Sequence, residues 1–379
     1  MDLSLNDDQK MLKDSVDRFV REQYPFETRR KIAATNEGWS KANWAKFAEL
    51  GWLGIPFGED EGGLGWGMVE LSVVMESFGQ GLVLEPYLAT VVLGGGIIAR
   101  AGSAAQKQAI LLGLVEGKVQ LATAYFEQQA RYNLADVKTS AKREGAGFVI
   151  SGQKGVVFNG PSADHFIVAA RTSGGQRDAK GITLFLVDAK AKGITRRDYP
   201  TQDALRASEI AFDNVAVGAV AVIGKLDDGL SVLEEAIDRA TVAICAEAVG
   251  CMDALNAATH EYLKTRTQFG VPIGKFQVLQ HRMVDMFTAA QEARSMVLMA
   301  TLKIDDADAT VRRKAASACK VQIGKSGRIV GQGAVQLHGG MGVTDELSVS
   351  HYFKRLTMID SVFGNQQHHL TRYGLLMAA

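Results

Sequence analysis

The spacing of hydrophobic residues changes twice along the 379-residue chain, and this limits the possible folds more than any other feature. Apolar residues recur at helical intervals over residues 1–118, gather in short runs over 119–225, and return to helical intervals over 226–379. The sequence therefore predicts an N-terminal helical region, a β-rich middle region and a C-terminal helical region. We expect an α+β fold, because strands and helices do not alternate along the chain.

The first region is predicted to consist of amphipathic helices. Asn6 is followed by two acidic residues, a combination that favours the start of a helix, and Pro25 is expected to end that helix. Residues 41–52 and 68–79 are predicted to form two further helices. All four tryptophans of the chain lie in this region.

The middle region contains short runs of β-branched and aromatic residues, separated by clusters of turn-forming residues. The predicted strands cover residues 119–126, 148–151, 154–158, 165–171, 181–188 and 207–212. No helical segment lies between them, so a parallel sheet with crossover helices does not fit.

The last region is predicted to form long helices. They cover residues 229–266, 276–304 and 309–337, and a final helical stretch ends the chain. The segment FGVPIGKF separates the first helix from the second, and DDADAT separates the second helix from the third. Long amphipathic helices joined by short turns are typical of a bundle.

Charge and cysteine content narrow the possible partners. Lys plus Arg and Asp plus Glu both number 42, so no net positive field is available to hold nucleic acid or an anionic membrane. The start MDLSLNDDQK is too polar for a signal peptide, and the longest apolar runs are too short to cross a bilayer. Three cysteines without a CxxC pair do not suggest a disulfide framework or a zinc site. We expect a cytoplasmic protein that binds neither nucleic acid nor membrane.

Two segments resemble phosphate-binding loops and one histidine pair resembles a metal site, but the surrounding sequence does not fit either kind of site. The GKS at 324–326 lies within a predicted helix and lacks the upstream glycine of a P-loop, and HGGMG at 338–342 follows no strand. His368 and His369 are adjacent, so on a helix their side chains point about 100° apart and do not suit one metal ion. We interpret both histidines as solvated helix residues.

Three segments carry a resemblance to a known family. They are VISGQKGVVFNG (149–160), RTQFGVPIGKFQVLQHRMVDM (266–286) and QLHGGMGV (336–343). In order and spacing they closely resemble the acyl-CoA dehydrogenase family, and the N-terminal ELGWLGIPFGEDEGGLG matches its style. The resemblance covers essentially the whole chain. It implies an N-terminal helical domain, a central β-barrel-like domain and a C-terminal four-helix bundle.

The resemblance also implies a reaction. In that family a carboxylate removes an α-proton from an acyl-CoA thioester, and the β-hydrogen leaves as hydride to the flavin of FAD. The expected partners are an acyl-CoA substrate, FAD, an electron-transfer flavoprotein as acceptor, and further subunits of a tetramer. FAD in this family lies across a subunit interface: the β domain of one subunit holds the flavin ring, and the C-terminal helices of a neighbour hold the adenosine and pyrophosphate.

The residues that hold the adenosine and pyrophosphate of FAD in the family look complete in this chain. Arg266 matches the arginine that reaches the pyrophosphate, for which a guanidinium is well suited. The glycine pair at 339–340 matches the place where missing side chains admit the cofactor. The residues that match this cofactor pocket are Arg266, Phe269, Gln277, Gln336, Gly339 and Gly340. The alternative is an ordinary surface arginine and a glycine pair that ends a helix.

The residues that hold the flavin ring in the family are mostly replaced in this chain. The family carries Thr-Glu-Pro-Gly-Ala-Gly-Ser-Asp in its flavin loop, whereas residues 126–133 here are FEQQARYN, without glycine. The family's next segment is Trp-Ile-Thr-Asn, and this chain has VVFN. Val156 replaces the tryptophan near the flavin, and Phe158 replaces the threonine whose hydroxyl reaches flavin N5. Only Asn159 remains.

The catalytic base is also missing from its usual position. Many members carry a glutamate 23 residues after the second glycine of the Gln-x-x-Gly-Gly segment, and from Gly340 that position is Phe363. A phenyl ring cannot accept a proton. Asn365 and Gln367, two and four residues further on, are predicted to keep roles in the flavin pocket.

Some members place the base on the first long C-terminal helix instead, ten residues before a glycine that is Gly250 here. That position is Ala240. Asp238 is offset from it by two residues, about 200° around an ideal helix. Asp238 is a candidate base and its neighbour Arg239 a candidate substrate-binding residue. The alternative is that both residues only form structural ion pairs.

These observations leave three hypotheses. The chain is the small, base-deficient subunit of a heteromeric α2β2 acyl-CoA dehydrogenase, resembling the small subunit of pimeloyl-CoA dehydrogenase, and contributes the ADP half of the FAD site. Alternatively, it is a self-sufficient homotetramer with a non-standard base, or a non-redox CoA-binding scaffold with the same fold. The first hypothesis best explains why the FAD-adenosine residues remain while the flavin and base positions have changed.

Overall fold

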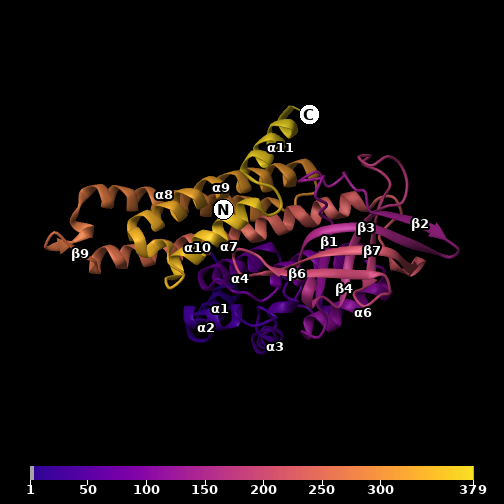
Figure 1. Ribbon diagram of the computed structural model, residues 1–379, viewed down its shortest axis with the longest axis horizontal. Coiled ribbons are helices and arrows are strands. Elements are labelled where there is room, and N and C mark those ends of the chain that lie inside the picture. Colours follow the sequence, from indigo (N-terminus) through magenta and orange to yellow (C-terminus); the bar gives the residue numbers. More distant parts are fainter. Residues whose placement is uncertain (1–3, 379) are drawn as a thin grey trace. The chain divides into compact units, whose positions relative to one another are not determined.

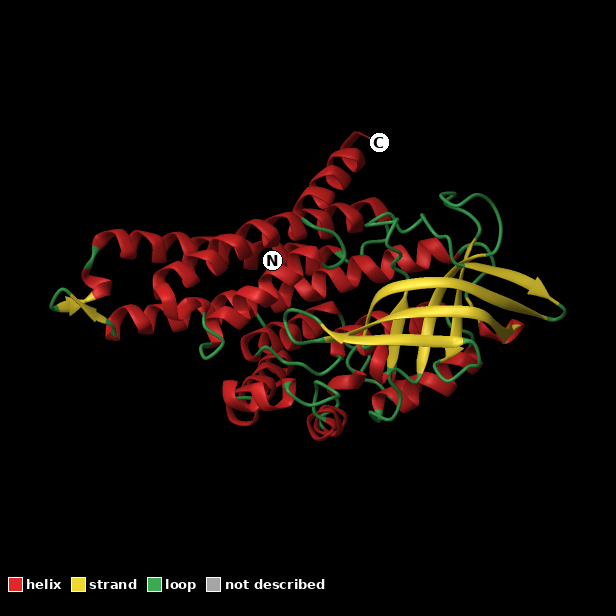
Figure 2. Ribbon diagram, viewed as in Figure 1, coloured by secondary structure: helices red, strands yellow, loops and turns green. Residues whose placement is uncertain are grey.

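The computed structural model describes residues 4–378 and confirms the α+β class, with helical terminal regions and a β-rich middle (Figure 2). The chain forms two compact units. Unit 1 comprises Met1–Lys31, Met68–Val83 and Thr241–Ala379, and unit 2 comprises Ile32–Gly67 and Leu84–Ala240. The division at residues 118 and 225 stays a prediction.

The first helix begins as its sequence indicates. The Asn6 side chain accepts a hydrogen bond from the Gln9 backbone at 2.8 Å, and the Gln9 side chain accepts one from the Asn6 backbone at 2.9 Å. The predicted helix 41–52 ends early, at Glu49, because Gly51 (φ 77°) turns the chain before a short 3₁₀ helix. The helical elements before the sheet are α1 (Asp7–Gln23), α2 (Phe26–Ala33), α3 (Lys41–Glu49), η1 (Trp52–Gly54), η2 (Glu59–Glu61), α4 (Met68–Gly81), η3 (Leu88–Gly95), α5 (Gly96–Ala101) and α6 (Ala104–Val115).

The strands of the middle region pair into one mixed eight-stranded sheet within unit 2. They are β1 (Leu121–Ala124), β2 (Ser140–Glu144), β3 (Gly147–Phe158), β4 (His165–Arg171), β5 (Ile182–Asp188), β6 (Ile194–Pro200), β7 (Arg206–Gly218) and β8 (Val222–Ile223). The order is β6-β7-β3-β2-β4-β5-β8, with β1 parallel to β4. Short 3₁₀ turns, η4 (Gly160–Ser162) and η5 (Ala219–Ala221), follow β3 and β7. Phe148, Phe166, Phe185 and Phe212 contribute to the core on this sheet.

The observed strands differ from the predicted ones in two ways: two predicted strands are one, and several strands were not predicted. Residues 148–151 and 154–158 form one strand, β3, because two register shifts against β7 absorb the break seen in the sequence. Strands β2 and β6 escaped prediction because most of their side chains are exposed and polar. Their strand geometry comes from pairing with β3 and β7, not from an apolar pattern of their own.

The C-terminal region forms long helices, with α8 and α9 side by side in Figure 1. The predicted final stretch is two helices, α10 and α11, separated by a turn at Phe363 and Gly364, which both have positive φ. The elements are α7 (Gly229–Thr265), β9 (Thr267–Gln268), β10 (Val271–Pro272), η6 (Ile273–Lys275), α8 (Gln277–Lys303), α9 (Ala309–His338), η7 (Gly339–Val343), α10 (Ser348–Ser361) and α11 (Gln366–Ala378).

Two glycines let α4 and α7 pack closely in unit 1. A Cβ atom at Gly79 would lie 1.9 Å from the Glu247 carbonyl oxygen, and one at Gly250 would lie 1.9 Å from the Glu76 carbonyl oxygen. Both distances are far below van der Waals contact, so any larger side chain would separate the helices. Gly250 thereby has a packing role of its own.

One helix in the described chain, α7, is long and apolar enough to cross a membrane by length and composition. The sequence-based statement that every apolar run is too short therefore needs correction. In this structure, 78% of its apolar window is buried, as in the core helix of a folded domain. The cysteines Cys245, Cys251 and Cys319 are buried free thiols.

Candidate functional site

The candidate residues for the adenosine and pyrophosphate lie at the ends of α7 and α9 in unit 1. Tyr262, near the end of α7, stacks on His338, the last residue of α9, with ring centroids 4.3 Å apart. The Tyr262 hydroxyl also donates to the His338 carbonyl at 3.5 Å. This contact brings the segment that starts at Arg266 beside the segment that starts at Gly339, although the two are far apart in the sequence.

A tight hairpin follows α7, and three of these candidates lie in it or beside it. Strands β9 and β10 pair antiparallel, and the residues between them, Phe269 and Gly270, have φ of 53° and 79°, as a type I′ turn requires. The Phe269 side chain is 90% exposed and meets the Phe276 ring edge-on at 6.1 Å. Gln277 begins α8 and is exposed, as is Arg266. Unit 1 therefore leaves Arg266, Phe269 and Gln277 open to a ligand.

The glycine pair after α9 has the open backbone that a bound cofactor needs. A Cβ atom at Gly339 or Gly340 would meet no heavy atom within 4 Å. Gly339 has a φ of 61°, so the turn that ends α9 is enough to explain a glycine at that position. Gly340 does not have a positive φ. No packing contact within residues 4–378 requires glycine at position 340.

The other two groups at these helix ends are also available. Arg266 forms no ion pair with any residue between 4 and 378, so its guanidinium can bind paired phosphate oxygens. Gln336 is exposed in the last turn of α9. The open glycine backbone, the guanidinium and this amide together suit the ADP half of FAD.

Phe363, at the position where many family members carry the base, lies in a tightly held turn between α10 and α11. Its φ is 61° and its side chain is buried, with 9% exposed. The fully buried ammonium of Lys320, on α9, donates to the carbonyl of Asp360 at 2.9 Å and to that of Gly364 at 2.6 Å. The turn is therefore fixed by backbone contacts, and its central side chain is apolar.

A buried histidine completes this turn. Nε2 of His369 lies 3.1 Å from the Phe363 carbonyl, and Nδ1 lies 3.3 Å from the Ser317 hydroxyl. Burial, with a smaller effect from the Lys320 charge, lowers the pKa of His369 to about 2. Burial also lowers the pKa of Lys320. The interpretation of His369 as a solvated residue was wrong, because packing of α11 against α9 encloses it.

The two candidates after Phe363 lie at the start of α11. The Asn365 side chain accepts a hydrogen bond from the His368 backbone at 2.9 Å, as a helix cap does. Gln367 is exposed. A role for either in flavin binding stays a prediction.

Asp238 is fully buried on the part of α7 that belongs to unit 2. Its neighbour Arg239 lies 3.5 Å from the Glu235 carboxylate, and Arg100 lies 2.5 Å from the same carboxylate. Glu235 thus joins two arginines in one charge network. This environment supports a structural interpretation of Arg239 over substrate binding.

The loop that holds the flavin ring in the family has a polar interior in this chain. Glu127 and Lys154 form a buried ion pair at 2.8 Å, and the Glu127 carboxylate also accepts hydrogen bonds from the backbones of Lys138 and Thr139. Burial alone would raise the pKa of Glu127, but the Lys154 charge and these hydrogen bonds lower it to about 2. Burial lowers the pKa of Lys154, partly offset by Glu127. The carboxylate therefore stays charged and serves to order the loop.

The segment after this loop keeps its backbone irregularity but has lost its polar side chain. Val156 has a φ of 47°, which is uncommon for a β-branched residue, and lies where the register between β3 and β7 shifts. Phe158 carries no hydroxyl. Asn159 has a φ of 60°, and its amide donates to the Thr90 hydroxyl and the Gln120 side chain at 3.1 and 2.9 Å. These buried bonds account for Asn159 without a cofactor.

Sequence reasoning missed a buried charge pair in unit 1. Glu247 on α7 and Arg355 on α10 form two parallel hydrogen bonds, at 2.6 and 2.7 Å, with both side chains almost fully enclosed. The signal was a lone glutamate in the apolar run AICAEAVGCM. In the part of the chain that the structure describes, no group of three or more His, Cys, Asp or Glu side chains could hold a metal ion.

Comparison with known families matches nearly the whole chain. Residues 6–118 match the description "Acyl-CoA dehydrogenase, N-terminal domain", residues 122–215 "Acyl-CoA dehydrogenase, middle domain", and residues 227–374 "Acyl-CoA dehydrogenase, C-terminal domain". The three matches follow the chain in order.

Individual relatives agree with this result. The chain is 30% identical to the mitochondrial isovaleryl-CoA dehydrogenase of Solanum tuberosum over 358 residues, 93% of this chain and 86% of the relative. Butyryl-CoA dehydrogenase of Megasphaera elsdenii has a TM-score of 0.92 at 25% identity, with 100% of each chain covered. The ChsE4-ChsE5 complex of Mycobacterium tuberculosis has a TM-score of 0.91 at 26% identity, covering 100% of this chain and 99% of the other.

The three family matches and the whole-length relatives agree with one another. Relatives and similar structures of this kind are FAD-binding flavoproteins. The chain belongs to the acyl-CoA dehydrogenase family of FAD-dependent oxidoreductases.

Proposed function

We propose that this chain is the base-deficient subunit of a heteromeric acyl-CoA dehydrogenase. The observation that carries the proposal is Phe363, an apolar residue at the base position, in a turn that Lys320 and His369 hold from inside the protein. The phenyl ring of Phe363 has no atom that could accept the α-proton. A partner subunit would then supply the base.

The ADP half of the cofactor site supports an active role within such a complex. FAD supplies the hydride acceptor of the reaction when it is bound. In this chain Arg266 would hold the pyrophosphate, and the bare backbone at Gly339 and Gly340 would allow close approach. Phe269, Gln277 and Gln336 would complete the pocket, with Asn365 and Gln367 nearer the flavin ring of the partner.

The chain's own flavin position argues against a second working site. The buried Glu127–Lys154 pair orders the loop internally, and Phe158 offers no hydroxyl to a flavin nitrogen. An α2β2 assembly, similar to the two-component ChsE4-ChsE5 complex in architecture, would therefore contain fewer working sites than subunits. The resemblance to the small subunit of pimeloyl-CoA dehydrogenase is part of the same proposal.

Three further features of the proposal rest on the family resemblance. The substrate is an acyl-CoA thioester that undergoes α,β-dehydrogenation, and an electron-transfer flavoprotein in the cytoplasm accepts the electrons. Residues 1–118, 119–225 and 226–379 act as an N-terminal helical, a middle β and a C-terminal helical domain.

The test is to purify the chain alone and together with a candidate large subunit, and to measure flavin absorbance, native mass and acyl-CoA-dependent flavin reduction. We expect a colourless chain alone and a yellow α2β2 complex with one FAD for each pair of subunits. A yellow homotetramer that an acyl-CoA reduces would overturn the proposal in favour of a self-sufficient enzyme.

The same preparations separate the two remaining alternatives. In a self-sufficient enzyme with Asp238 as base, Asp238→Asn would abolish flavin reduction; near wild-type reduction would exclude that role. A colourless tetramer that binds CoA but takes up no FAD with any partner would indicate a non-redox scaffold instead.

A further inference from the structure

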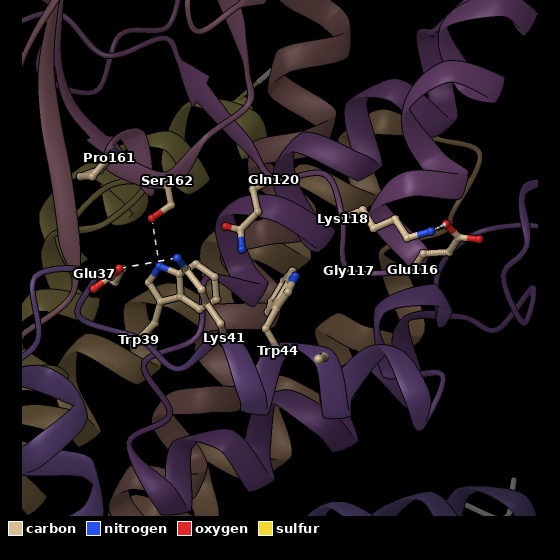
Figure 3. A pocket seen from close by; sticks show the side chains of 11 residues that line it. Glu37, Trp39, Lys41, Trp44, Glu116, Gly117, Lys118, Gln120, Pro161 and Ser162 are labelled. Carbon is tan, nitrogen blue, oxygen red and sulfur yellow. Dashed lines mark hydrogen bonds and ion pairs between the residues drawn. The ribbon is translucent and has the colours of Figure 1, made fainter.

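A pocket of about 570 Å³ lies in unit 2, between α3, the segment before β1 and the turn η4 (Figure 3). Its two indole rings, Trp39 and Trp44, contact each other edge to face and leave no space for a ligand ring between them. Its two lysines, Lys41 and Lys118, each lie close to a glutamate, at 3.6 and 2.8 Å. The groups of this pocket therefore contact one another, and we assign no ligand to it.

Tyr262, on α7, contacts both open segments of the ADP half in unit 1. Its backbone carbonyl accepts a hydrogen bond from the Arg266 backbone at 2.9 Å. Its ring stacks on His338, with 4.3 Å between the ring centroids and 29° between the ring planes. Its hydroxyl donates to the carbonyl of His338, the residue directly before Gly339, at 3.5 Å. One tyrosine thus connects the arginine to the glycine pair.

The imidazole ring of His338 is fixed by its own helix. Nδ1 lies 2.8 Å from the Ala334 carbonyl, one turn earlier on α9. A carbonyl only accepts hydrogen bonds, so the ring carries its proton on Nδ1. The side chain is buried, and burial lowers the pKa of the imidazole, which therefore stays neutral. His338 gives the Tyr262 ring a fixed flat surface to stack on.

The segments on either side of the stacked rings are tightly held. A Cβ atom at Gly342 would lie 2.5 Å from the Val335 carbonyl oxygen and 3.1 Å from the His338 Cβ, so the turn η7 folds closely against the last turn of α9. The Arg266 carbonyl accepts a hydrogen bond from the Ile273 backbone at 2.8 Å, which closes the β9–β10 hairpin. A displacement of either ring would therefore displace one of the two open segments.

We propose that Tyr262 and His338 are positioning residues for the ADP half of FAD. The stacked rings fix the separation between the Arg266 guanidinium and the open backbone at Gly339 and Gly340. This inference rests on the proposed function, because it takes the ADP half of the cofactor to bind at these two segments. The two phosphates of a nucleoside diphosphate have a fixed spacing, so donors from separate segments must be held to within about 0.5 Å to bind both.

Tyr262→Leu tests this role, because it removes the aromatic ring and keeps an apolar side chain. In the flavin-free complex with the large subunit, we expect the affinities for ADP and for FAD to fall at least about tenfold, because the two segments are no longer held at one separation. Calorimetry with ADP and titration with FAD measure both affinities. Flavin reduction at saturating FAD should stay near the wild-type rate, because the lost interaction changes binding and not the reacting atoms.

Tyr262→Phe keeps the stack and loses only a weak hydrogen bond, so it should bind ADP within about threefold of the wild type. His260→Leu, at an exposed position on the same helix, is the matched control and should leave ADP affinity unchanged. If Tyr262→Leu does not fold, Tyr262→Met fills the space with a flexible apolar chain and should show the same loss of ADP affinity.

A folded Tyr262→Leu complex that binds ADP as tightly as the wild type overturns the positioning role and leaves the ADP site in place. A lower free energy of unfolding with unchanged ADP affinity of the folded complex also overturns it, because the ring then serves stability alone. If the wild-type complex binds no ADP, or if Arg266→Ala does not weaken ADP binding, the proposed function fails and this inference fails with it.

Discussion

The ends of α7 and α9 and the turn between α10 and α11 both carry positions tied to catalysis in this family, yet they differ physically. The first region is exposed: among residues 4–378, Arg266 has no ion-pair partner and no atom lies within 4 Å of a Cβ placed at Gly340. The second is closed: Phe363 is buried and Lys320 satisfies the carbonyls around it. An open region with unused hydrogen-bonding groups is suited to a ligand, and a closed region to stability.

The flavin loop in unit 2 resembles the closed region. Its glutamate faces a buried lysine and two backbone amides. We therefore expect changes in the closed regions to lower the free energy of unfolding, and changes in the open region to lower FAD affinity.

Glu127→Gln should have the largest effect on stability. It leaves the fully buried Lys154 ammonium without its counter-charge, which costs about 4 kcal/mol of unfolding free energy. Urea denaturation measures the loss. The double variant with Lys154→Met should recover most of it, since no buried charge is then left unpaired. A loss below about 1 kcal/mol for Glu127→Gln would show that the loop is not closed.

Phe363→Ala should lower the free energy of unfolding by about 3 kcal/mol, because it removes a buried phenyl ring from the turn. FAD affinity and turnover of the assembled complex should stay within a factor of two under conditions where the protein is folded. Leu370→Ala, at an exposed position on α11, is the control for stability. A large drop in turnover with intact folding would instead give Phe363 a role at the reacting atoms.

Arg266→Ala should show the opposite pattern. Removing a guanidinium from a pyrophosphate costs about 1.5–3 kcal/mol of binding, roughly 10- to 100-fold in FAD affinity. The unfolding free energy of the flavin-free protein should change by less than about 0.5 kcal/mol, because the side chain is exposed. Flavin titration and denaturation of the same preparation measure both. Arg266→Lys should recover part of the affinity; full FAD occupancy in Arg266→Ala would refute the ADP-half assignment.

His369 should make the closed turn sensitive to acid. Its pKa is about 2 in the folded protein and about 6.5 when unfolded, so below pH 6.5 only the unfolded state binds the proton. Its contribution is complete above pH 6.5 and falls by about 1.4 kcal/mol per pH unit as the pH drops toward 2. His369→Gln should remove this slope between pH 6.5 and 5 in denaturation curves. An identical slope in the variant would mean that His369 is protonated without unfolding.

Gly340→Ala should have the smallest effect. A Cβ atom there meets no neighbouring atom, so stability should stay within about 0.5 kcal/mol. FAD affinity should still fall a few-fold, because the methyl group occupies the space where the cofactor approaches. Gly339→Ala should also lower the free energy of unfolding, by about 1 kcal/mol, because its φ of 61° favours glycine. Equal FAD affinity in Gly340→Ala and the wild type would remove this backbone from the site.

The sequence predicted the helices well where a long periodic pattern was present, as in α8 and α9, whose bounds lie within a residue or so of expectation. It failed at β2 and β6, because an exposed strand takes its geometry from the neighbours that pair with it. It also failed at His369. Adjacent histidines on a helix look solvated until another helix packs over one of them.

The candidate site divides in the same way. The amino-acid sequence by itself determined the fold class, the family, and the absence of a carboxylate at position 363, since these depend on residue types and spacing along one chain. Only the tertiary structure decided that Phe363 is buried, that Lys320 binds the carbonyls of Asp360 and Gly364, and that Glu127 faces Lys154. Burial and hydrogen-bond partners depend on which distant segments meet, and no local pattern encodes that meeting.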